Sequence, residues 1–151
     1  MPTLHEQIDT ALPIEAAFTF LADFANAATW DPGTATSTRV DDGPVRVGSQ
    51  FALGVRMAGS VRPMTYRIVR LDPDRQVTLE GSGSGVAAVD TLTFERRADG
   101  TRVDYVAQIR LLGWRRLVEP FLGGAFAKIA RDARAGMTRA LDERARRHAE
   151  S

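Results

Sequence analysis

A regular series of turn signals constrains this chain more than any other feature of its sequence. Each signal is a short cluster drawn largely from Gly, Pro, Asp and Ser, and the clusters occupy residues 41–44, 59–60, 72–75, 83–85 and 99–100. Between them run segments rich in β-branched and apolar residues. Turn signals that recur in this way are typical of consecutive hairpins. The sequence therefore predicts a long antiparallel meander.

Pairing the strands across these turns sorts their side chains onto two faces. A turn at 83–85 places Leu79 opposite Asp90, with Ile109 on the next strand, and a turn at 99–100 places Phe94 opposite Tyr105. The pairings agree on one apolar face, which collects Phe51, Leu53, Val55, Met57, Met64, Tyr66, Ile68, Val77, Leu79, Leu92, Phe94, Tyr105, Ala107, Ile109 and Leu111. A slip of one residue would invert this sorting, so the agreement supports a curved sheet with one dry face.

The segments that flank the meander are predicted to be a short strand and helices. Residues 4–9 resemble a strand, and from Pro13 the apolar side chains recur at helical spacing until the break at residues 30–33. From Glu119 and Pro120 onward the chain carries an apolar stripe at spacings of three and four, formed by Leu122, Phe126, Ile129, Ala130, Ala133, Met137, Ala140 and Leu141. This long C-terminal helix is expected to cover the dry face.

Composition narrows the classes of function. A length of 151 residues suits a single domain over residues 1–151. Twenty basic and nineteen acidic side chains leave a net charge of +1, which gives no long-range attraction to nucleic acid or to an anionic membrane. No apolar run reaches the length of an integral membrane segment, and no leader is evident. A cytoplasmic protein is therefore expected.

The chain also lacks the side chains of many catalytic and metal sites. It has no cysteine, which excludes disulfides, thiol catalysis and cysteine-ligated metals. Its two histidines, His5 and His148, lie near opposite ends of the chain and are both expected on the surface. A histidine-based triad or metal cluster needs imidazole inside a cleft. The sequence therefore predicts neither a metal nor a cofactor.

The order of these elements, together with several local motifs, resembles a known family. The motifs are residues 12–18 at a helix start, the Trp30-Asp31-Pro32 turn, and residues 47–51, 66–73 and 101–105. They are similar to the START-like superfamily, in its polyketide cyclase/dehydrase and lipid-transport (SRPBCC) group. The resemblance implies an α+β helix-grip fold: a curved seven-stranded antiparallel sheet around a long C-terminal helix, with two short helices after the first strand. It also implies a cavity for a lipid, polyketide or aromatic compound, in members that range from cyclases and dehydratases to carriers and sensors.

Asp90 is the most informative polar residue of the predicted dry face. An isolated buried carboxylate either finds a cation or stays protonated. Arg62 and Arg70 share its nominal parity and could reach it. Two interpretations stay open: an internal salt bridge or a bulge that turns Asp90 outward, and a general acid/base or ligand anchor. Tyr66 and Tyr105, the only tyrosines, fall on the same face and are the other catalytic candidates.

Three hypotheses for function follow. The first is a carrier or sensor for a small hydrophobic or amphipathic molecule, the second a cyclase or dehydratase that uses Asp90 with Tyr66 or Tyr105. The third is a protein-interaction module, for which the sequence shows no exposed apolar surface on the helix. The protein is expected to be a monomer or a homodimer. The predicted ligand-binding residues are Trp30, Phe51, Leu53, Val55, Met57, Met64, Tyr66, Leu79, Asp90, Leu92, Tyr105, Ile109, Leu122 and Phe126.

Overall fold

Seven antiparallel strands form one curved sheet in the computed structural model, which describes residues 3–151. The strands are β1 (Thr3–Thr10), β2 (Thr34–Arg39), β3 (Gln50–Met57), β4 (Ser60–Asp72), β5 (Gln76–Gly83), β6 (Val86–Arg97) and β7 (Gly100–Leu111). Their order in the sheet is β1-β7-β6-β5-β4-β3-β2, so β2 to β7 form the predicted meander and β1 joins its far edge beside β7.

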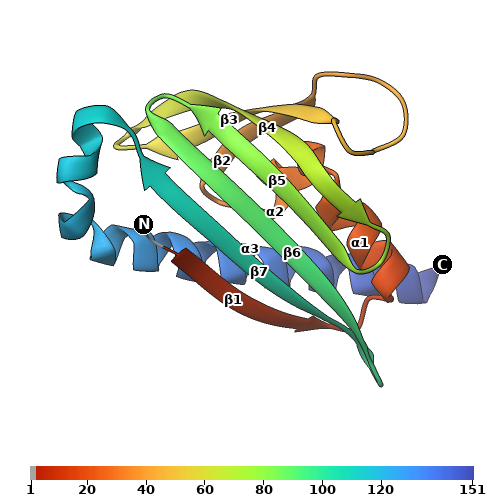
Figure 1. Cartoon of the computed structure of the whole chain (residues 1–151). Coiled ribbons are helices and arrows are strands. Elements are labelled where there is room, and N and C mark those ends of the chain that lie inside the picture. The colour runs from red at the N-terminus through yellow and green to blue at the C-terminus, as the bar shows by residue number, and fades with distance from the viewer. Residues whose placement is uncertain (1–2) are drawn as a thin grey trace.

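Helices cover the inner face of this sheet. Between β1 and β2 lie α1 (Ile14–Ala22), the short 3₁₀ helix η1 (Phe24–Asn26) and α2 (Ala27–Trp30). After β7 come two 3₁₀ helices, η2 (Gly113–Leu117) and η3 (Glu119–Phe121), and then α3 (Gly123–Glu150), which runs the length of the sheet (Figure 1). This is the predicted helix-grip fold. No helix among residues 3–151 has the length and apolarity needed to cross a membrane.

The long helix begins later than the sequence predicts. Its first residue is Gly123, because the segment that starts at Glu119 and Pro120 forms a 3₁₀ turn instead of the first α-helical turn. Proline suits the first turn of either helix type, so it does not distinguish them. The η2–η3 segment, residues 112–121, therefore stands as a separate unit between the sheet and α3.

The strand register agrees with the prediction in one hairpin and differs by two residues in another. Leu79 lies opposite Asp90 as predicted. In the β6–β7 hairpin, however, Phe94 pairs with Val103, and Asp90 pairs with Ala107. The reason is the turn, which lies one residue earlier than predicted, between Arg97 and Gly100. A shift of two residues leaves every side chain on its predicted face, because the side-chain period of a strand is two.

A close backbone contact fixes α3 against the inner helices. A Cβ atom at Gly136 of α3 would lie 2.1 Å from the Trp30 carbonyl oxygen and 2.9 Å from the Pro32 ring. Only glycine allows the helix to approach the end of α2 so closely. This contact sets the distance between α3 and the turn that carries Trp30.

Candidate functional site

Asp90 points into the molecule from the centre of the sheet. Its exposed fraction is only 5%, and its Oδ2 accepts a 2.9 Å hydrogen bond from the Tyr105 hydroxyl. Neither of the expected arginines reaches it. Arg62 is exposed, and a β-bulge after Ile68 leaves Arg70 exposed, where it pairs with Asp72 at 2.8 Å. The predicted salt bridge or outward turn of Asp90 is therefore wrong, and a tyrosine replaces the cation.

The surroundings of Asp90 favour its protonated form. Burial raises the pKa of this carboxyl, and the nearby charge of Asp31 raises it further, while the hydrogen bond from Tyr105 opposes both. The net effect is a pKa of about 7. At neutral pH the carboxyl can therefore give or take a proton, which is the property of a general acid/base.

Tyr66 lies next to this pair and presents a free hydroxyl. It makes no hydrogen bond to another described residue, and the side chain keeps 8% exposure. Burial and the charges of Asp90 and Asp31 raise its pKa, so the hydroxyl stays protonated and can donate. Gly81, directly opposite on β5, makes room for its ring, because a Cβ there would lie 2.5 Å from the ring carbons.

Trp30 adds a second donor without a partner. The side chain is 1% exposed, and its indole Nε1–H is fully enclosed with no hydrogen-bond acceptor among the described residues. Its ring packs edge-on against Tyr105, with ring centroids 5.6 Å apart, and also against Phe24. An enclosed N–H without an acceptor costs about 1–3 kcal/mol. Such a group calls for a water molecule or a ligand atom.

Asp31 is a member of this cluster that the sequence did not single out. Burial raises the pKa of its carboxyl, while hydrogen bonds from the Gly33 N–H at 2.9 Å and the Thr34 hydroxyl at 3.0 Å lower it. These bonds hold the turn after α2. Asp31 acts on Asp90 through its charge alone. Its position in the Trp30-Asp31-Pro32 turn was the only sequence signal available.

The other predicted lining residues differ in how deeply they are buried. Phe51, Leu79 and Leu92 are 0% exposed and pack in the closed part of the core. Leu53, Met64, Tyr105 and Phe126 keep between 3% and 9% exposure. The least covered are Val55, Met57, Ile109 and Leu122. Burial thus decreases toward the β3–β4 hairpin, η2 and the start of α3.

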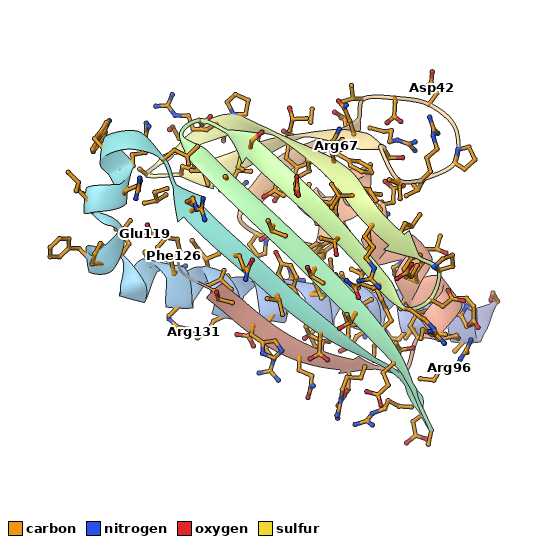
Figure 2. The ribbon with its side chains drawn as sticks, in the orientation of Figure 1. Asp42, Arg67, Arg96, Glu119, Phe126 and Arg131 are labelled. Atoms are coloured by element: carbon orange, nitrogen blue, oxygen red, sulfur yellow. The ribbon has the colours of Figure 1, made fainter. Side chains whose placement is uncertain are left out.

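This less buried end of the grip is also where the surface is hollowed. A groove of about 590 Å³ lies between the β3–β4 hairpin and the first turns of α3 and is lined by Arg56, Ala58, Gly59, Ser60, Val61, Ala125, Lys128 and Ile129. Figure 2 shows Phe126 at this end of α3, beside the η2–η3 segment, and Arg96 at the opposite end of the sheet. We refer to this end as the mouth.

The mouth exposes apolar side chains, which was not expected from the sequence. Val61, Leu112, Trp114, Leu117, Val118, Phe121 and Ile129 are all exposed there. The prediction that the long helix exposes no apolar side chain is therefore wrong, because Ile129 of α3 is exposed. These side chains fit a helical or a strand pattern equally well, so the sequence alone did not separate them from the core.

A second hollow, of about 570 Å³, lies on the outer face of the sheet. Its lining is mostly polar and includes Gln50, Thr65, Arg67, Glu80, Gln108 and Arg110. It contains none of the predicted lining residues. The polar cluster with unpaired donors is on the inner face, so we place the candidate site there.

The described residues contain no group that could hold a metal ion. His5 lies exposed on β1, 3.4 Å from Asp104, and His148 is exposed in the last turns of α3. The inner cluster offers hydrogen-bond donors and the carboxyls of Asp90 and Asp31, both with a raised pKa, surrounded by apolar and aromatic side chains.

The sequence matches the family model described as polyketide cyclase / dehydrase and lipid transport over residues 1–147. The chain belongs to this family. No curated protein matches it in sequence.

Several solved structures share this fold with little sequence identity. The Zhui aromatase/cyclase from Streptomyces sp. R1128 is 15% identical, with a TM-score of 0.77, and the match covers 98% of this chain and 95% of that one. A START superfamily protein from Mycobacterium smegmatis is 15% identical, with a TM-score of 0.73 and coverage of 96% and 97%. A Thermus thermophilus protein is 14% identical, with a TM-score of 0.77 and coverage of 99% and 100%. At this identity the likeness shows the fold.

Proposed function

We propose that this protein binds a small, largely apolar molecule that carries a hydrogen-bond acceptor, such as a ketone oxygen, between the inner face of the sheet and α3. The acceptor lies against the donors of Tyr66 and Trp30. The rest of the molecule extends past the predicted lining residues toward the mouth. The protein acts as a carrier or sensor for such a lipid, polyketide or aromatic compound.

The enclosed indole N–H of Trp30 is the observation that carries this proposal. Polar hydrogens in a folded core are nearly always paired, whereas this one has no acceptor among the described residues. The indole ring packs on Tyr105, whose hydroxyl donates to Asp90, and the charge of Asp90 acts in turn on the free hydroxyl of Tyr66. A site of apolar walls with a few convergent polar groups is typical of small-molecule binding. The centre of the grip is filled by its own aromatic rings, so a ligand that reaches Trp30 displaces the side chains that cover it.

Two probe molecules of one shape test the role of the donors. α-Tetralone and tetralin are bicyclic compounds that differ by a ketone, and calorimetry measures the affinity of each. One recovered hydrogen bond predicts that tetralone binds about tenfold more tightly. The variant Tyr66→Phe should reduce this preference. Thr65→Val, on the exposed side of the same strand, should leave it unchanged.

The NMR signal of the Trp30 indole N–H reports directly on contact between Trp30 and the bound compound. The chain has two tryptophans, so Trp114→Phe leaves Trp30 as the only source of an indole N–H signal. Tetralone should shift this signal downfield, as a new hydrogen bond does, and tetralin should not. Equal affinity for the two compounds together with an unmoved indole signal would refute the proposal.

A second function, an enzyme of the cyclase or dehydratase kind, is supported by the pKa of Asp90 near 7 and its hydrogen bond to Tyr105. Aldol-type cyclisation and dehydration begin with proton transfer at the carbon beside a ketone. In this reading Asp90 takes that proton as the carboxylate and returns one as the acid, while Tyr66 donates to the ketone oxygen.

Isotope exchange tests the hypothesis of an enzyme without a known substrate. Proton NMR in D₂O follows the loss of the hydrogens beside the ketone of tetralone. Catalysed exchange that rises through neutral pH and is abolished by Asp90→Asn supports the enzyme reading. If tetralone binds but its hydrogens exchange no faster than in buffer, the enzyme hypothesis fails and the protein functions in binding alone.

A further inference from the structure

The η2–η3 segment at the mouth exposes large apolar side chains in an unusual density. Trp114, Leu117 and Phe121 are 68%, 77% and 84% exposed, and Leu112 and Val118 are also exposed. Figure 1 shows this segment, in turquoise, standing off the end of the sheet where β7 leads into α3. A cluster of exposed apolar side chains on a protruding segment marks an interaction surface.

The charge around this segment is strongly positive although the chain is almost neutral. Residues 110–131 contain five basic residues (Arg110, Arg115, Arg116, Lys128 and Arg131) and one acidic residue, Glu119, for a net charge of +4. The whole chain carries +1, so the remainder carries −3. Lys128 pairs with Asp132, whereas Arg110, Arg116 and Arg131 form no ion pair among residues 3–151.

The side chains of the segment are the kinds that settle at a lipid interface. Segments that lie at a membrane surface are rich in Trp and Phe, which enter the boundary between headgroups and acyl chains. They are also rich in Lys and Arg, which are attracted to anionic headgroups. Arg115 lies over the Trp114 ring, 5.3 Å from its centroid, and is exposed. Apolar tips flanked by cations are complementary to an anionic membrane surface.

We propose that the η2–η3 segment docks this protein on the surface of an anionic lipid bilayer, with Trp114, Leu117 and Phe121 inserted among the headgroups. The segment adjoins the mouth, so docking would bring the proposed ligand site to the membrane. This consequence rests on the proposed function, but docking itself does not. The overall charge of the chain hides this feature, since the positive cluster is confined to one end.

Vesicle co-sedimentation tests the proposal with the full chain. The vesicles are pure phosphatidylcholine, or one part phosphatidylglycerol to two parts phosphatidylcholine. We expect binding to the mixed vesicles that weakens as salt is raised. The double variant Arg115→Gln/Arg116→Gln should reduce this binding roughly thirtyfold, because each cation near an anionic surface contributes about fivefold. Trp114→Ser/Phe121→Ser should abolish it.

Matched controls lie at the opposite end of the molecule. Val40 and Val47 are exposed apolar side chains in the β2–β3 loop, and Arg75 is an exposed arginine in the β4–β5 turn. Figure 1 shows the β2–β3 loop at the far end of the grip from η2–η3. The variants Val40→Ser/Val47→Ser and Arg75→Gln should bind the mixed vesicles as the parent protein does.

Two outcomes would overturn the proposal. One is vesicle binding that is absent, or that is unaffected by the η2–η3 variants. The other is a dimer in light scattering that these variants dissociate, which would assign the apolar side chains to a second copy of the chain. Tetralone binding in solution is measured on the same proteins. If tetralone binds while vesicles do not, only docking fails, and the reverse result removes the ligand proposal and leaves docking standing.

Discussion

Replacing Asp90 by asparagine should change how the stability of this protein depends on pH. The carboxyl is enclosed beside Tyr105 and has a pKa of about 7, whereas the ordinary pKa of an aspartate is 3.8. Between these two values the folded protein holds a proton that the unfolded chain releases. Stability therefore falls as pH rises through this window, and above pH 7 the full penalty is present. Asparagine cannot ionise and removes this dependence.

The size of the effect follows from the two pKa values of Asp90. A difference of about three pKa units corresponds to about 4 kcal/mol at high pH. At about pH 5 some of this penalty is already present, so the part lost between roughly pH 5 and pH 8 is about 2.5 kcal/mol. Burial and the charge of Asp90 raise the pKa of Tyr66 and Tyr105 well above the ordinary value of 10.0, so neither tyrosine titrates between pH 5 and pH 8. The difference between the parent and the asparagine variant in this window therefore reports on Asp90.

Urea unfolding at the two pH values measures this quantity. The parent protein should lose about 2.5 kcal/mol more than Asp90→Asn on going from pH 5 to pH 8. All other groups are present in both proteins, so most of their titration cancels in the difference. Asp99→Asn, in an exposed turn, serves as the matched control and should follow the parent.

Parallel pH profiles for the parent and Asp90→Asn would contradict a raised pKa for Asp90. Such a result would mean that Asp90 has an ordinary pKa, and therefore that water or a cation solvates it in the folded protein. A steeper profile for the variant would have the wrong sign and would have the same consequence.

Three further predictions follow from single contacts. Gly136→Ala should lower the unfolding free energy by about 2 kcal/mol or more, because its Cβ would meet the Trp30 carbonyl. The control Gly124→Ala in the same helix has open space around it and should raise the unfolding free energy by up to about 1 kcal/mol. An unchanged stability of Gly136→Ala would show that α3 lies farther from α2. Tyr105→Phe should raise the pKa of Asp90 further, since it removes the one hydrogen bond that lowers it, and infrared titration of the carboxyl band would detect the change; an unchanged midpoint would contradict the pairing. Gly81→Ala should displace the Tyr66 ring and weaken tetralone binding. The control Gly59→Ala meets no neighbour and should leave binding intact, with a small loss of stability because its φ is positive. Equal tetralone affinity in the two variants would show that Tyr66 is not part of the site.

The sequence predicted which side chains share a face better than which side chains touch. Alternation in a strand survives a two-residue error in register, so the inner face was assigned correctly although the β6–β7 turn was placed one residue too late. The same error hid the central contact. With Asp90 placed opposite Ile109, Tyr105 would lie four residues along β7 from that partner. Opposite Ala107, Tyr105 is only two residues away and becomes a diagonal neighbour of Asp90.

Two other features of the site depend on placement that no sequence pattern specifies. Whether Trp30 finds an acceptor for its N–H is decided by the orientation of one ring, and the same is true of the free hydroxyl of Tyr66. The exposed η2–η3 segment was assigned in part to the long helix, because Pro120 suits the first turn of either helix type. The hydrophobic pattern shows that a side chain is apolar and does not show whether a neighbour covers it.

Native mass spectrometry of the protein, purified gently from its own host, shows directly whether the protein holds a small apolar ligand. We expect a stoichiometric apolar compound with an acceptor group, which is released on denaturation and is retained less well by Tyr66→Phe. An empty protein that also fails to bind fatty acids, sterols, aromatic polyketides and tetralone would contradict this expectation. In that case the enclosed polar cluster would be a feature of the core alone.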